Sequence, residues 1–370
     1  MKEKRIAHKI IISAFIIIIC SPWFLWIFLE KFVDTTNYEN REMAVRPSLT
    51  LDNYGTYSEE YEKYFNDNIP FRNNMITLNN AIDYFVFKKS ASDRVIVGDD
   101  NWLFYCRTDD GDPVGCYKGT NLLSDEQLCQ IKQNCLLQRD FLAEQGKEFV
   151  IFIAPNKERV YSEYMPEQYG KPAENYQALQ IYNYLKENTD LKIVYPYDEL
   201  MEAKKNIDYN IYSKTDTHWN YIGGYIGACA LLDVLDIEMP KITDSQMTIT
   251  VGDEESGDLA GMLNLNNKLK IADHSYTVSG YDDHNMQVIE EDFNTMYSYS
   301  ANNADPRKIY VLRDSFSTHM ARYIGSQFSE SYLRHRNTYS YDDLVNINPD
   351  IVVFEIVERY VWYLQYFSIQ

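Results

Sequence analysis

The sequence predicts an α/β protein, with helices on both faces of a parallel sheet and one N-terminal transmembrane helix before it. Three observations predict this fold class. An apolar run of membrane-spanning length, without any charged residue, lies near the N-terminus. Short, nearly continuous apolar segments recur further along, each typical of a strand buried on both faces. Helical patterns separate these segments, and such strand–helix alternation builds a sheet covered by helices on both sides.

The composition bounds the size of the domain and excludes one class of partner. The chain has 370 residues, of which 45% are hydrophobic and 24% charged, which is enough for a sizeable core. The formal net charge is −20. Such a charge repels phosphate backbones, so we expect no nucleic-acid binding. The 32 tyrosines are explained by composition bias and core packing, although Tyr also stacks on sugar rings.

The N-terminal apolar run, residues 10–29, contains no charged residue. A helix needs about 20 residues to cross the hydrocarbon core of a bilayer, so this run suffices. Basic residues precede it, and Trp23 and Trp26 lie near its end, as in an interfacial aromatic belt. The positive-inside rule predicts a cytoplasmic tail and signal-anchor over residues 1–31, with a globular extracellular domain after them. A cleaved signal peptide is the alternative, but no small-residue cleavage pattern ends the run.

The six cysteines are compatible with an oxidising compartment. Cys106 and Cys116 flank a polar loop rich in Asp and Gly, and a disulfide that closes this loop is one expectation. Cys20 follows three isoleucines rather than the small residue of a lipoprotein signal, so we expect no lipidation. The chain has no Cys-x-x-Cys pair, and no zinc site is expected.

The exported part begins with a stalk and a helical lead-in, over residues 32–92. A helical pattern covers residues 61–89 and is broken at residues 68–70, which include a proline. The main domain is expected to span residues 93–370 and to open with a short hairpin at residues 95–105.

Four strands and three long helices alternate in this domain. The strands are expected at residues 148–154, 191–195, 308–312 and 351–356. The helices are expected at residues 124–145, 176–188 and 221–235, and the first begins with a capping-box pattern. Residues 240–305 are polar with short alternating runs, which indicates an insertion of β-hairpins and loops.

Ser315 is the candidate nucleophile. Ester chemistry requires a nucleophile, a base, a group that orients the base, and donors for the oxyanion. Ser315 follows the strand 308–312 and precedes a helix-like segment, 317–324. Ligand sites of open α/β sheets gather at such strand ends, and a helix N-terminus offers free amides to a developing oxyanion. An Asp-Ser-Phe tripeptide alone, however, often occurs by chance.

Asp216 and His218 are the candidate partners of this serine, within the segment Thr-Asp-Thr-His-Trp. Residues two apart in an extended loop project to the same side. The Asp216 carboxylate can then hold the imidazole and leave its other nitrogen for Ser315. Two structural alternatives stay open: His218 as a core or capping histidine beside a buried Trp219, and Asp216 as the cap of the helix that begins near Tyr221.

Taken together, these motifs resemble the SGNH-like domain of the bacterial alginate O-acetyltransferases and, more closely, the related DHHW family of cell-surface proteins. The matching segments cover nearly the whole exported chain: 39–41 (ENR), 65–67 (FND), 102–105 (WLFY), 155–166 (PNKERVYSEYMP), 215–220 (TDTHWN), 257–263 (GDLAGML), 311–316 (VLRDSF) and 353–360 (VFEIVERY). The resemblance implies an SGNH-like, flavodoxin-like three-layer fold. It implies Ser315 as nucleophile, His218 as general base and Asp216 as the orienting acid, with the Asp-x-His element before the serine. No cofactor is expected.

Two positions depart from the family pattern. Thr217 stands where the family name has a second histidine, and its place between acid and base need not disable the triad. Arg313 replaces the glycine usual before Asp-Ser, where it either closes off backbone approach or binds an anionic group of the substrate. Asn156, Arg313 and Trp219 are the candidates for substrate or oxyanion contacts. Asn156 is explained equally well as a turn residue after Pro155.

The remaining titratable groups are given structural roles. His319, one turn after Ser315, is expected to line the helix. Glu358 and Arg359, at the end of the last strand, are expected to form a structural ion pair at the rim of the site. The Asp-Asp-His run at residues 282–284 has unspecific ligand spacing, and no metal site is expected.

The resemblance implies an extracytoplasmic O-acetyltransferase that moves an acetyl group through Ser315 to a hydroxyl of an extracellular polysaccharide or wall polymer. Acetyl donors are cytoplasmic, so it also implies a multi-pass membrane acyltransferase as the partner that supplies acetyl groups. A carbohydrate acetyl-esterase would use the same triad with water. A non-catalytic, membrane-tethered glycan-binding or scaffold protein would keep only the fold. The sequence alone leaves these three open.

Overall fold

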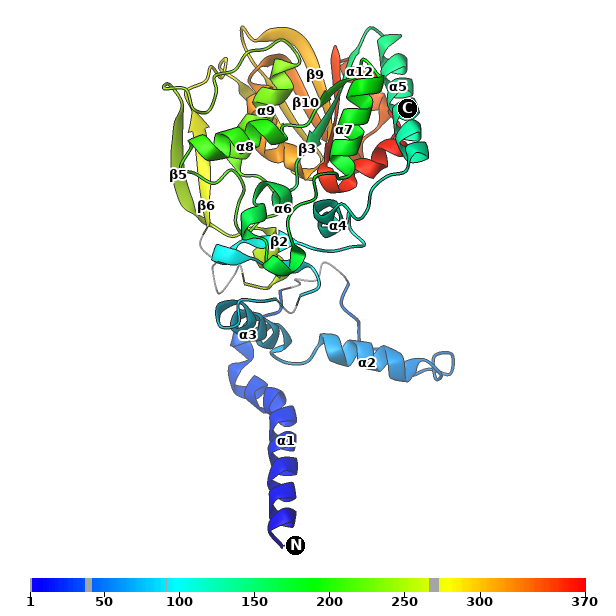
Figure 1. The fold of residues 1–370 in the computed structure, drawn as a ribbon. Helices are drawn as coiled ribbons and strands as arrows, with labels where there is room; N and C mark the ends of the chain where they lie inside the picture. Colours follow the sequence, from blue (N-terminus) through cyan, green and yellow to red (C-terminus); the bar gives the residue numbers. More distant parts are fainter. Residues whose placement is uncertain (1, 37–41, 91, 266–272) are drawn as a thin grey trace. The chain divides into compact units, whose positions relative to one another are not determined.

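The computed structural model describes residues 2–36, 42–90, 92–265 and 273–370, and Figure 1 shows its ribbon. The chain divides into two compact units. The first comprises residues up to 91 together with 261–269. The second comprises residues 92–260 and 270–370.

The first unit is helical. Its elements are α1 (Lys2–Leu29), the short 3-10 helix η1 (Glu30–Phe32), α2 (Tyr57–Asp67) and α3 (Arg72–Phe85). The stretch His8–Phe32 is long and apolar enough to cross a membrane, by length and composition. The expected break at residues 68–70 is confirmed, because a proline lacks the N–H that would continue α2.

The second unit opens with the expected hairpin, in which β1 (Val95–Val97) pairs antiparallel with β2 (Leu103–Tyr105). Its seven-stranded sheet has the order β4-β3-β11-β9-β10-β8-β7. The strands of this sheet are β3 (Glu148–Ala154), β4 (Lys192–Val194), β7 (Gln287–Glu291), β8 (Met296–Ser300), β9 (Asp305–Arg313), β10 (Phe328–His335) and β11 (Ile351–Val357).

This sheet is mixed rather than purely parallel. The pairs β4–β3, β3–β11, β11–β9 and β9–β10 are parallel, as expected for the main part of the sheet. The hairpin β7–β8 then extends it antiparallel beyond β10. We did not expect β10 from the sequence, because most of its residues are polar, they do not alternate regularly with apolar ones, and only part of the strand is buried.

Helices cover both faces of the sheet, as the fold class predicted. On one face lie α8 (Tyr197–Asn206), α9 (Tyr221–Asp233) and α11 (Ala321–Gly325); on the other lie α5 (Asp125–Ala143), α7 (Gln177–Asn188) and α12 (Tyr341–Ile347) (Figure 1). Alternate residues of β3 enter the two cores: Val150 and Phe152 face the first set, and Phe149 and Ile151 the second. This is the period of two that a doubly covered strand imposes.

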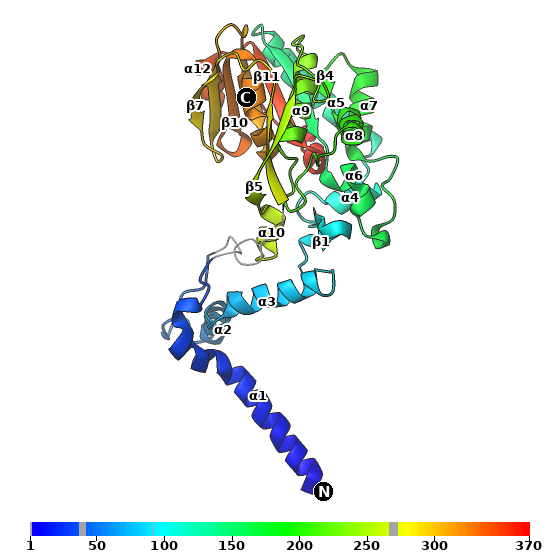
Figure 2. The same ribbon diagram turned by 90° about the vertical axis from the view of Figure 1, so that its left-hand side faces the viewer.

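Residues 240–305 hold the expected hairpins. One is formed by β5 (Thr248–Glu255) and β6 (Asp273–Ser279), which pair antiparallel in a separate two-stranded sheet (Figure 2). The other is β7–β8. The short helix α10 (Asp258–Met262) follows β5.

The disulfide expected between Cys106 and Cys116 is absent, because both are free thiols. Cys116 lies within a short helix, α4 (Pro113–Lys118), and is fully buried. Its thiol faces Asn121, whereas the Cys106 thiol donates to the Asp93 carbonyl. Burial raises the pKa of Cys106 to about 11 and that of Cys116 to about 12, so both stay protonated at neutral pH.

Candidate active site

Ser315 lies on a tightly held turn where β9 ends and the 3-10 helix η5 (Ser315–His319) begins. Asp314 caps this helix, and its Oδ1 accepts a hydrogen bond of 2.9 Å from the Phe316 amide. The other carboxylate oxygen accepts one of 2.8 Å from the amide of Val357 on β11. Burial opposes the charge of Asp314, but the nearby Arg336 and these hydrogen bonds lower its pKa overall. The turn is therefore bonded to the neighbouring strand.

Glu355, on β11, lies beneath this turn and is 1% exposed. Its Oε2 accepts hydrogen bonds from the Asp314 amide over 2.7 Å and from the Ser317 hydroxyl over 2.9 Å. Burial, and then the negative charge of Asp314, raise the pKa of Glu355 well above its usual range. The two neighbouring carboxyl groups under the serine turn thus have pKa values shifted in opposite directions, that of Glu355 upward and that of Asp314 downward.

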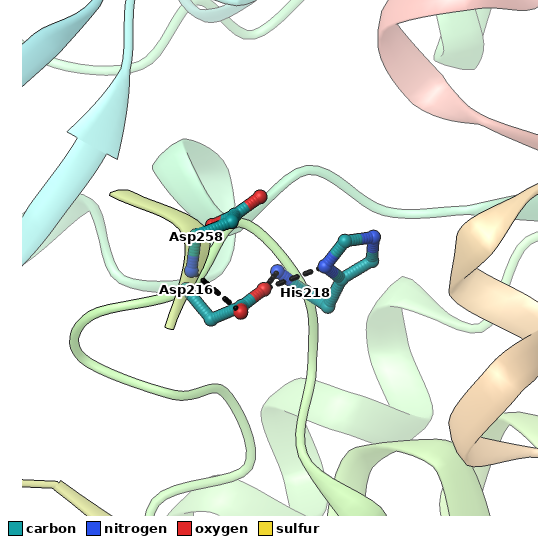
Figure 3. Close-up of side chains that lie close together, drawn as sticks. All are labelled: Asp216, His218 and Asp258. Atoms are coloured by element: carbon teal, nitrogen blue, oxygen red, sulfur yellow. Dashed lines mark hydrogen bonds and ion pairs between the residues drawn. The ribbon is translucent and has the colours of Figure 1, made fainter. Parts of the chain in front are cut away.

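Asp216, His218 and Ser315 lie within hydrogen-bonding distance in a row. The His218 Nε2 is 2.7 Å from the Ser315 hydroxyl oxygen, and its Nδ1 is 2.5 Å from Asp216 Oδ1. Figure 3 shows the Asp216 carboxylate aimed at the His218 ring. Burial disfavours the charged imidazolium, but the adjacent Asp216 outweighs it, so the pKa of His218 is raised. The pKa of Asp216 is lowered, because burial is outweighed by the charge and hydrogen bond of His218.

One structural alternative, Asp216 as the cap of α9, does not describe the geometry. The cap of α9 is Asn220, whose side-chain oxygen accepts hydrogen bonds from the amides of Ile222 and Gly223. Asp216 instead accepts hydrogen bonds from the amide and the ring of His218. The role of a simple helix cap is therefore filled elsewhere.

Asp258, at the start of α10, is a supporting residue that sequence reasoning missed. Its amide donates to Asp216 Oδ2 over 3.0 Å. Its carboxylate accepts from the Thr217 amide and the Thr217 hydroxyl, each over 2.7 Å. The hydroxyl of Thr217, which replaces the second histidine of the family name, thereby links Asp258 to the Asp216–His218 segment. The only sequence signal was the segment GDLAGML, which had no role assigned.

Two further residues hold Asp216 in place. A Cβ atom on Gly257 would lie 2.4 Å from the Asp216 Cβ, so only glycine fits there. The ammonium group of the buried Lys157 donates to the carbonyls of Lys214, over 2.9 Å, and of Asp216, over 2.7 Å. Burial lowers the pKa of Lys157 to about 8.

Asp216, His218 and Asp258 offer ligand atoms within 4.8 Å of one another, which is the spacing of a metal site. Their hydrogen bonds, however, already involve both Asp216 oxygens, both Asp258 oxygens and both His218 nitrogens. The hydrogen-bonding groups of these three side chains are therefore paired with groups of the chain itself, and the cluster forms a chain of hydrogen bonds that ends at Ser315.

Arg313 and Trp219 are not placed as the sequence suggested. Both are fully buried. The Arg313 guanidinium donates to backbone carbonyls, most closely that of Phe293 over 2.6 Å, and lies 4.4 Å from the Tyr297 ring centroid. Trp219 donates from its indole Nε1 to the Phe316 carbonyl. Because both bind their own chain and are excluded from solvent, we withdraw the expectation of substrate contact for these two residues.

Asn156 follows β3 and is 1% exposed. Its amide N–H donates to Glu358 Oε2 over 2.9 Å. Neither polar atom of its side chain has a hydrogen-bond partner. A buried amide without partners is unusual and stays a candidate for a ligand contact.

The ion pair expected between Glu358 and Arg359 is not formed. Glu358 lies 3.4 Å from Arg159 instead, and it also accepts from the Tyr195 hydroxyl. His319 lies beside the site, with its ring centroid 6.4 Å from that of His218. Burial, and then the charge of His218, lower the pKa of His319 to about 4, so it is neutral.

This arrangement is one that acyl transfer requires. In such a triad a neutral histidine accepts the serine proton while the hydroxyl oxygen attacks an acyl carbon, and a carboxylate stabilises the imidazolium that forms. Among the described residues, the Ser315 amide has no hydrogen-bond acceptor. It is therefore free to donate to an oxyanion.

Residues 95–292 match the family described as SGNH hydrolase-like domain, acetyltransferase AlgX. The match covers more than half of the chain, including Asp216 and His218, and ends before Ser315. A probable alginate O-acetylase AlgJ from Pseudomonas putida is 28% identical over 222 residues, which are 59% of this chain and 54% of that protein. The AlgJ of Azotobacter vinelandii is 27% identical over 216 residues, 57% of this chain and 52% of that protein. The chain thus spans about half the length of the curated relatives it matches.

Solved structures show the same fold. A DHHW family protein from Eubacterium siraeum has a TM-score of 0.52 at 14% identity, covering 74% of this chain and 92% of that chain. Bacillus cereus PatB1, solved with a sulfonyl adduct, has a TM-score of 0.51 at 15% identity, covering 72% of this chain and 97% of that chain. The resemblance and the fold class expected from the sequence are thus confirmed.

Proposed function

The chain belongs to the family of SGNH hydrolase-like domains that includes the acetyltransferase AlgX, and on that premise we propose that it is an extracytoplasmic O-acetyltransferase acting on a polysaccharide. Ser315 accepts the acetyl group, His218 is the general base and Asp216 orients His218. The single observation that carries this proposal is the 2.7 Å separation between the His218 Nε2 and the Ser315 hydroxyl oxygen. Those two residues are 97 positions apart in sequence.

The reaction consists of two acyl transfers. Ser315 attacks the acetyl carbonyl, its proton passes to the His218 Nε2, and the donor leaves with that proton as an alcohol. A hydroxyl of the acceptor sugar then gives its proton to His218 and attacks the acetyl-serine, which releases Ser315 and the acetylated sugar. If water takes the place of the sugar, the same steps make the protein an esterase.

The position of the chain in the membrane is also part of the proposal. Residues 1–31 form a cytoplasmic tail and membrane anchor, residues 32–92 a stalk and lead-in, and residues 93–370 the catalytic domain on the outer side. The apolar stretch His8–Phe32 supports the anchor. We further propose that a multi-pass membrane acyltransferase delivers the acetyl group, because acetyl donors are made in the cytoplasm. The acceptor is an extracellular polysaccharide, the polymer class that the names of the AlgJ relatives imply.

The test uses the full chain purified in detergent. Wild type, Ser315→Ala and the exposed-site control Ser368→Ala are each incubated with nitrophenyl acetate, and intact mass is measured. We expect one acetyl adduct on wild type and on the control, and none on Ser315→Ala. Adding candidate glycans should shorten the life of the adduct and yield acetylated sugar. Acetate release that glycans leave unchanged would favour an esterase. No adduct and no turnover above Ser315→Ala would favour a binding or scaffold role.

A further inference from the structure

Arg359 lies at the same edge of the sheet as Ser315. It belongs to the segment that follows β11, the strand next to β9. In the β11–β9 register, Phe354 is opposite Leu312. Three residues further along each strand, Val357 is therefore level with Ser315, and the Val357 amide bonds to Asp314. Arg359 follows two residues later, in the 3-10 helix η7 (Glu358–Gln365).

The Arg359 guanidinium is surrounded by aromatic rings. Its central carbon lies 5.2 Å from the ring centroid of Tyr360, 5.5 Å from that of Phe316 and 5.9 Å from that of Tyr105. Phe316 follows Ser315 directly, and its ring centroid is 4.8 Å from that of His218. Aromatic rings attract the positive charge but accept few of the five N–H groups of a guanidinium, so N–H groups are left for an acceptor from a ligand.

This guanidinium has no ion-pair partner within the described parts of the chain. The expected partner, Glu358, is bonded to Arg159. The Arg359 Nε is buried and has no hydrogen-bond acceptor. The neighbouring Tyr360, and then Asp314 and Glu158, favour its positive charge, but none of the three forms an ion pair with it. Arg359 is half-buried, and a buried N–H without an acceptor, such as its Nε, is costly; a negatively charged group from a ligand would therefore complete this site.

We propose that Arg359 is a further catalytic residue, which donates hydrogen bonds to the oxyanion formed on the acyl carbonyl during attack by Ser315. The inference rests on the proposed function. In the step concerned, the Ser315 oxygen forms a bond to the carbonyl carbon and its proton moves to His218. The electron pair of the carbonyl π bond moves onto the carbonyl oxygen, and Arg359 binds the charge that develops there. Collapse of this intermediate restores the carbonyl and expels the donor, which takes the proton from His218.

The other oxyanion candidates are less well placed than Arg359. Arg313 is committed to backbone carbonyls and fully buried. Asn156 follows β3, which is separated from β9 by β11. Neighbouring strands lie about 4.8 Å apart, so Asn156 starts roughly 10 Å from the serine strand. Arg359 starts one strand nearer and has a longer side chain.

The experiment compares full-length wild type, Arg359→Ala, Arg359→Lys and Arg322→Ala on the neutral substrate nitrophenyl acetate. Arg322 serves as the matched control, because it is an exposed arginine paired with Glu291. We expect Arg359→Ala to lower kcat/KM by about 10²–10³-fold, mainly through kcat, and Arg359→Lys to lower it less. Free guanidinium ion should restore part of the activity of Arg359→Ala. Because the positive charge of Arg359 opposes protonation of His218, its removal should also move the acid limb of the pH profile upward.

The outcomes separate this inference from the proposed function. If Ser315→Ala is inactive while a folded Arg359→Ala retains the wild-type kcat/KM, the proposed function stands and the inference is overturned. A loss in Arg359→Ala that guanidinium does not restore, measured beside the thermal melt of each variant, assigns Arg359 to packing and also overturns it. Wild type that acquires no acetyl group overturns the proposed function and, with it, this inference.

Discussion

The indole Nε1 of Trp219 donates a hydrogen bond of 2.9 Å to the carbonyl of Phe316. Trp219 follows His218, and Phe316 follows Ser315, so this bond joins the two segments that carry the proposed base and nucleophile. Both side chains are fully buried. We therefore expect the tryptophan of the DHHW pattern to act as a positioning residue that sets the distance between the imidazole and the hydroxyl.

Replacing Trp219 with Phe should loosen this junction. The change leaves the Phe316 carbonyl without its donor, which costs about 1–3 kcal/mol of unfolding free energy. A small displacement of Ser315 lowers kcat by up to about 10²-fold. Thermal melts and kinetics on a reporter ester measure both. Trp102→Phe is the matched control, because the buried Trp102 Nε1 has no acceptor to lose. Equal effects of the two substitutions would contradict the role given to the hydrogen bond.

The pH dependence of activity should follow the raised pKa of His218. A general base acts in its neutral form, so activity rises with pH through this pKa, and the acid limb lies above the ordinary histidine value of 6.5. In Asp216→Asn the carboxylate charge is gone and burial dominates. The acid limb should therefore move to lower pH while kcat falls by about 10³–10⁴-fold. An acid limb that stays in place in Asp216→Asn would show that Asp216 does not set this pKa.

Gly257→Ala should displace Asp216 and lower activity, although Asp216, His218 and Ser315 all keep their own side chains. The added Cβ would lie 2.4 Å from the Asp216 Cβ and 2.6 Å from its Oδ2, so Asp216 must shift. We expect a loss of activity of about 10²-fold or more, since displaced catalytic groups are costly. Gly55→Ala is the control, because its Cβ would meet nothing within 4 Å. Wild-type kinetics in Gly257→Ala would refute the placement of Asp216.

Glu355→Gln should reduce the loss of folding stability that accompanies a rise in pH. The pKa of Glu355 is raised by burial, and then by Asp314, above its ordinary value of 4.5. A group whose pKa is higher in the folded than in the unfolded state contributes to folding stability. The contribution is complete at pH values below the unfolded-state pKa, and it is lost as the pH rises toward the folded-state pKa. Glutamine stays neutral and can still accept from the Asp314 amide. Thermal melts should therefore favour the variant increasingly as the pH rises above 4.5, whereas parallel curves for the two proteins would show that Glu355 does not titrate in the range measured.

The orientation of the anchor can be measured directly. Alkaline phosphatase fused after Gln370 should be active, because it folds only outside the cytoplasm, and a green fluorescent protein at the same place should be dark. Deleting residues 1–31 should reverse both signals. An inactive phosphatase on the full chain would contradict the proposed topology, independently of the chemistry at Ser315.

The local pattern of the sequence located many elements correctly. The strand expected at residues 148–154 has the same bounds in β3, because a strand buried on both faces must be apolar throughout. The capping box before α5 is formed as expected, by Ser124 and Gln127. The position of Ser315 at the end of β9 also followed from local pattern alone. Each of these features depends on neighbours within a few residues.

The supporting contacts of the site depend on distant residues and were missed. Lys157 binds the carbonyl of Asp216, 59 positions away, and Asp258 donates to the same residue from 42 positions away. β10 was not predicted because its mostly polar, half-buried sequence, without regular alternation, resembles a surface loop. Arg313 was predicted to contact a substrate, but it is fully buried and its Nε donates to the carbonyl of Leu333 on β10.

The sequence by itself determined the apolar N-terminal segment, the strand–helix alternation, the Asp-x-His order and the serine at a strand end, because hydrophobic period and local spacing encode these directly. Only the tertiary structure decided that His218 reaches Ser315, that Glu358 pairs with Arg159, and that Arg359 is left without an ion-pair partner among the described residues. The physical reason is that partners of buried charges are chosen by the packing of whole strands and helices, which brings together side chains far apart in the chain.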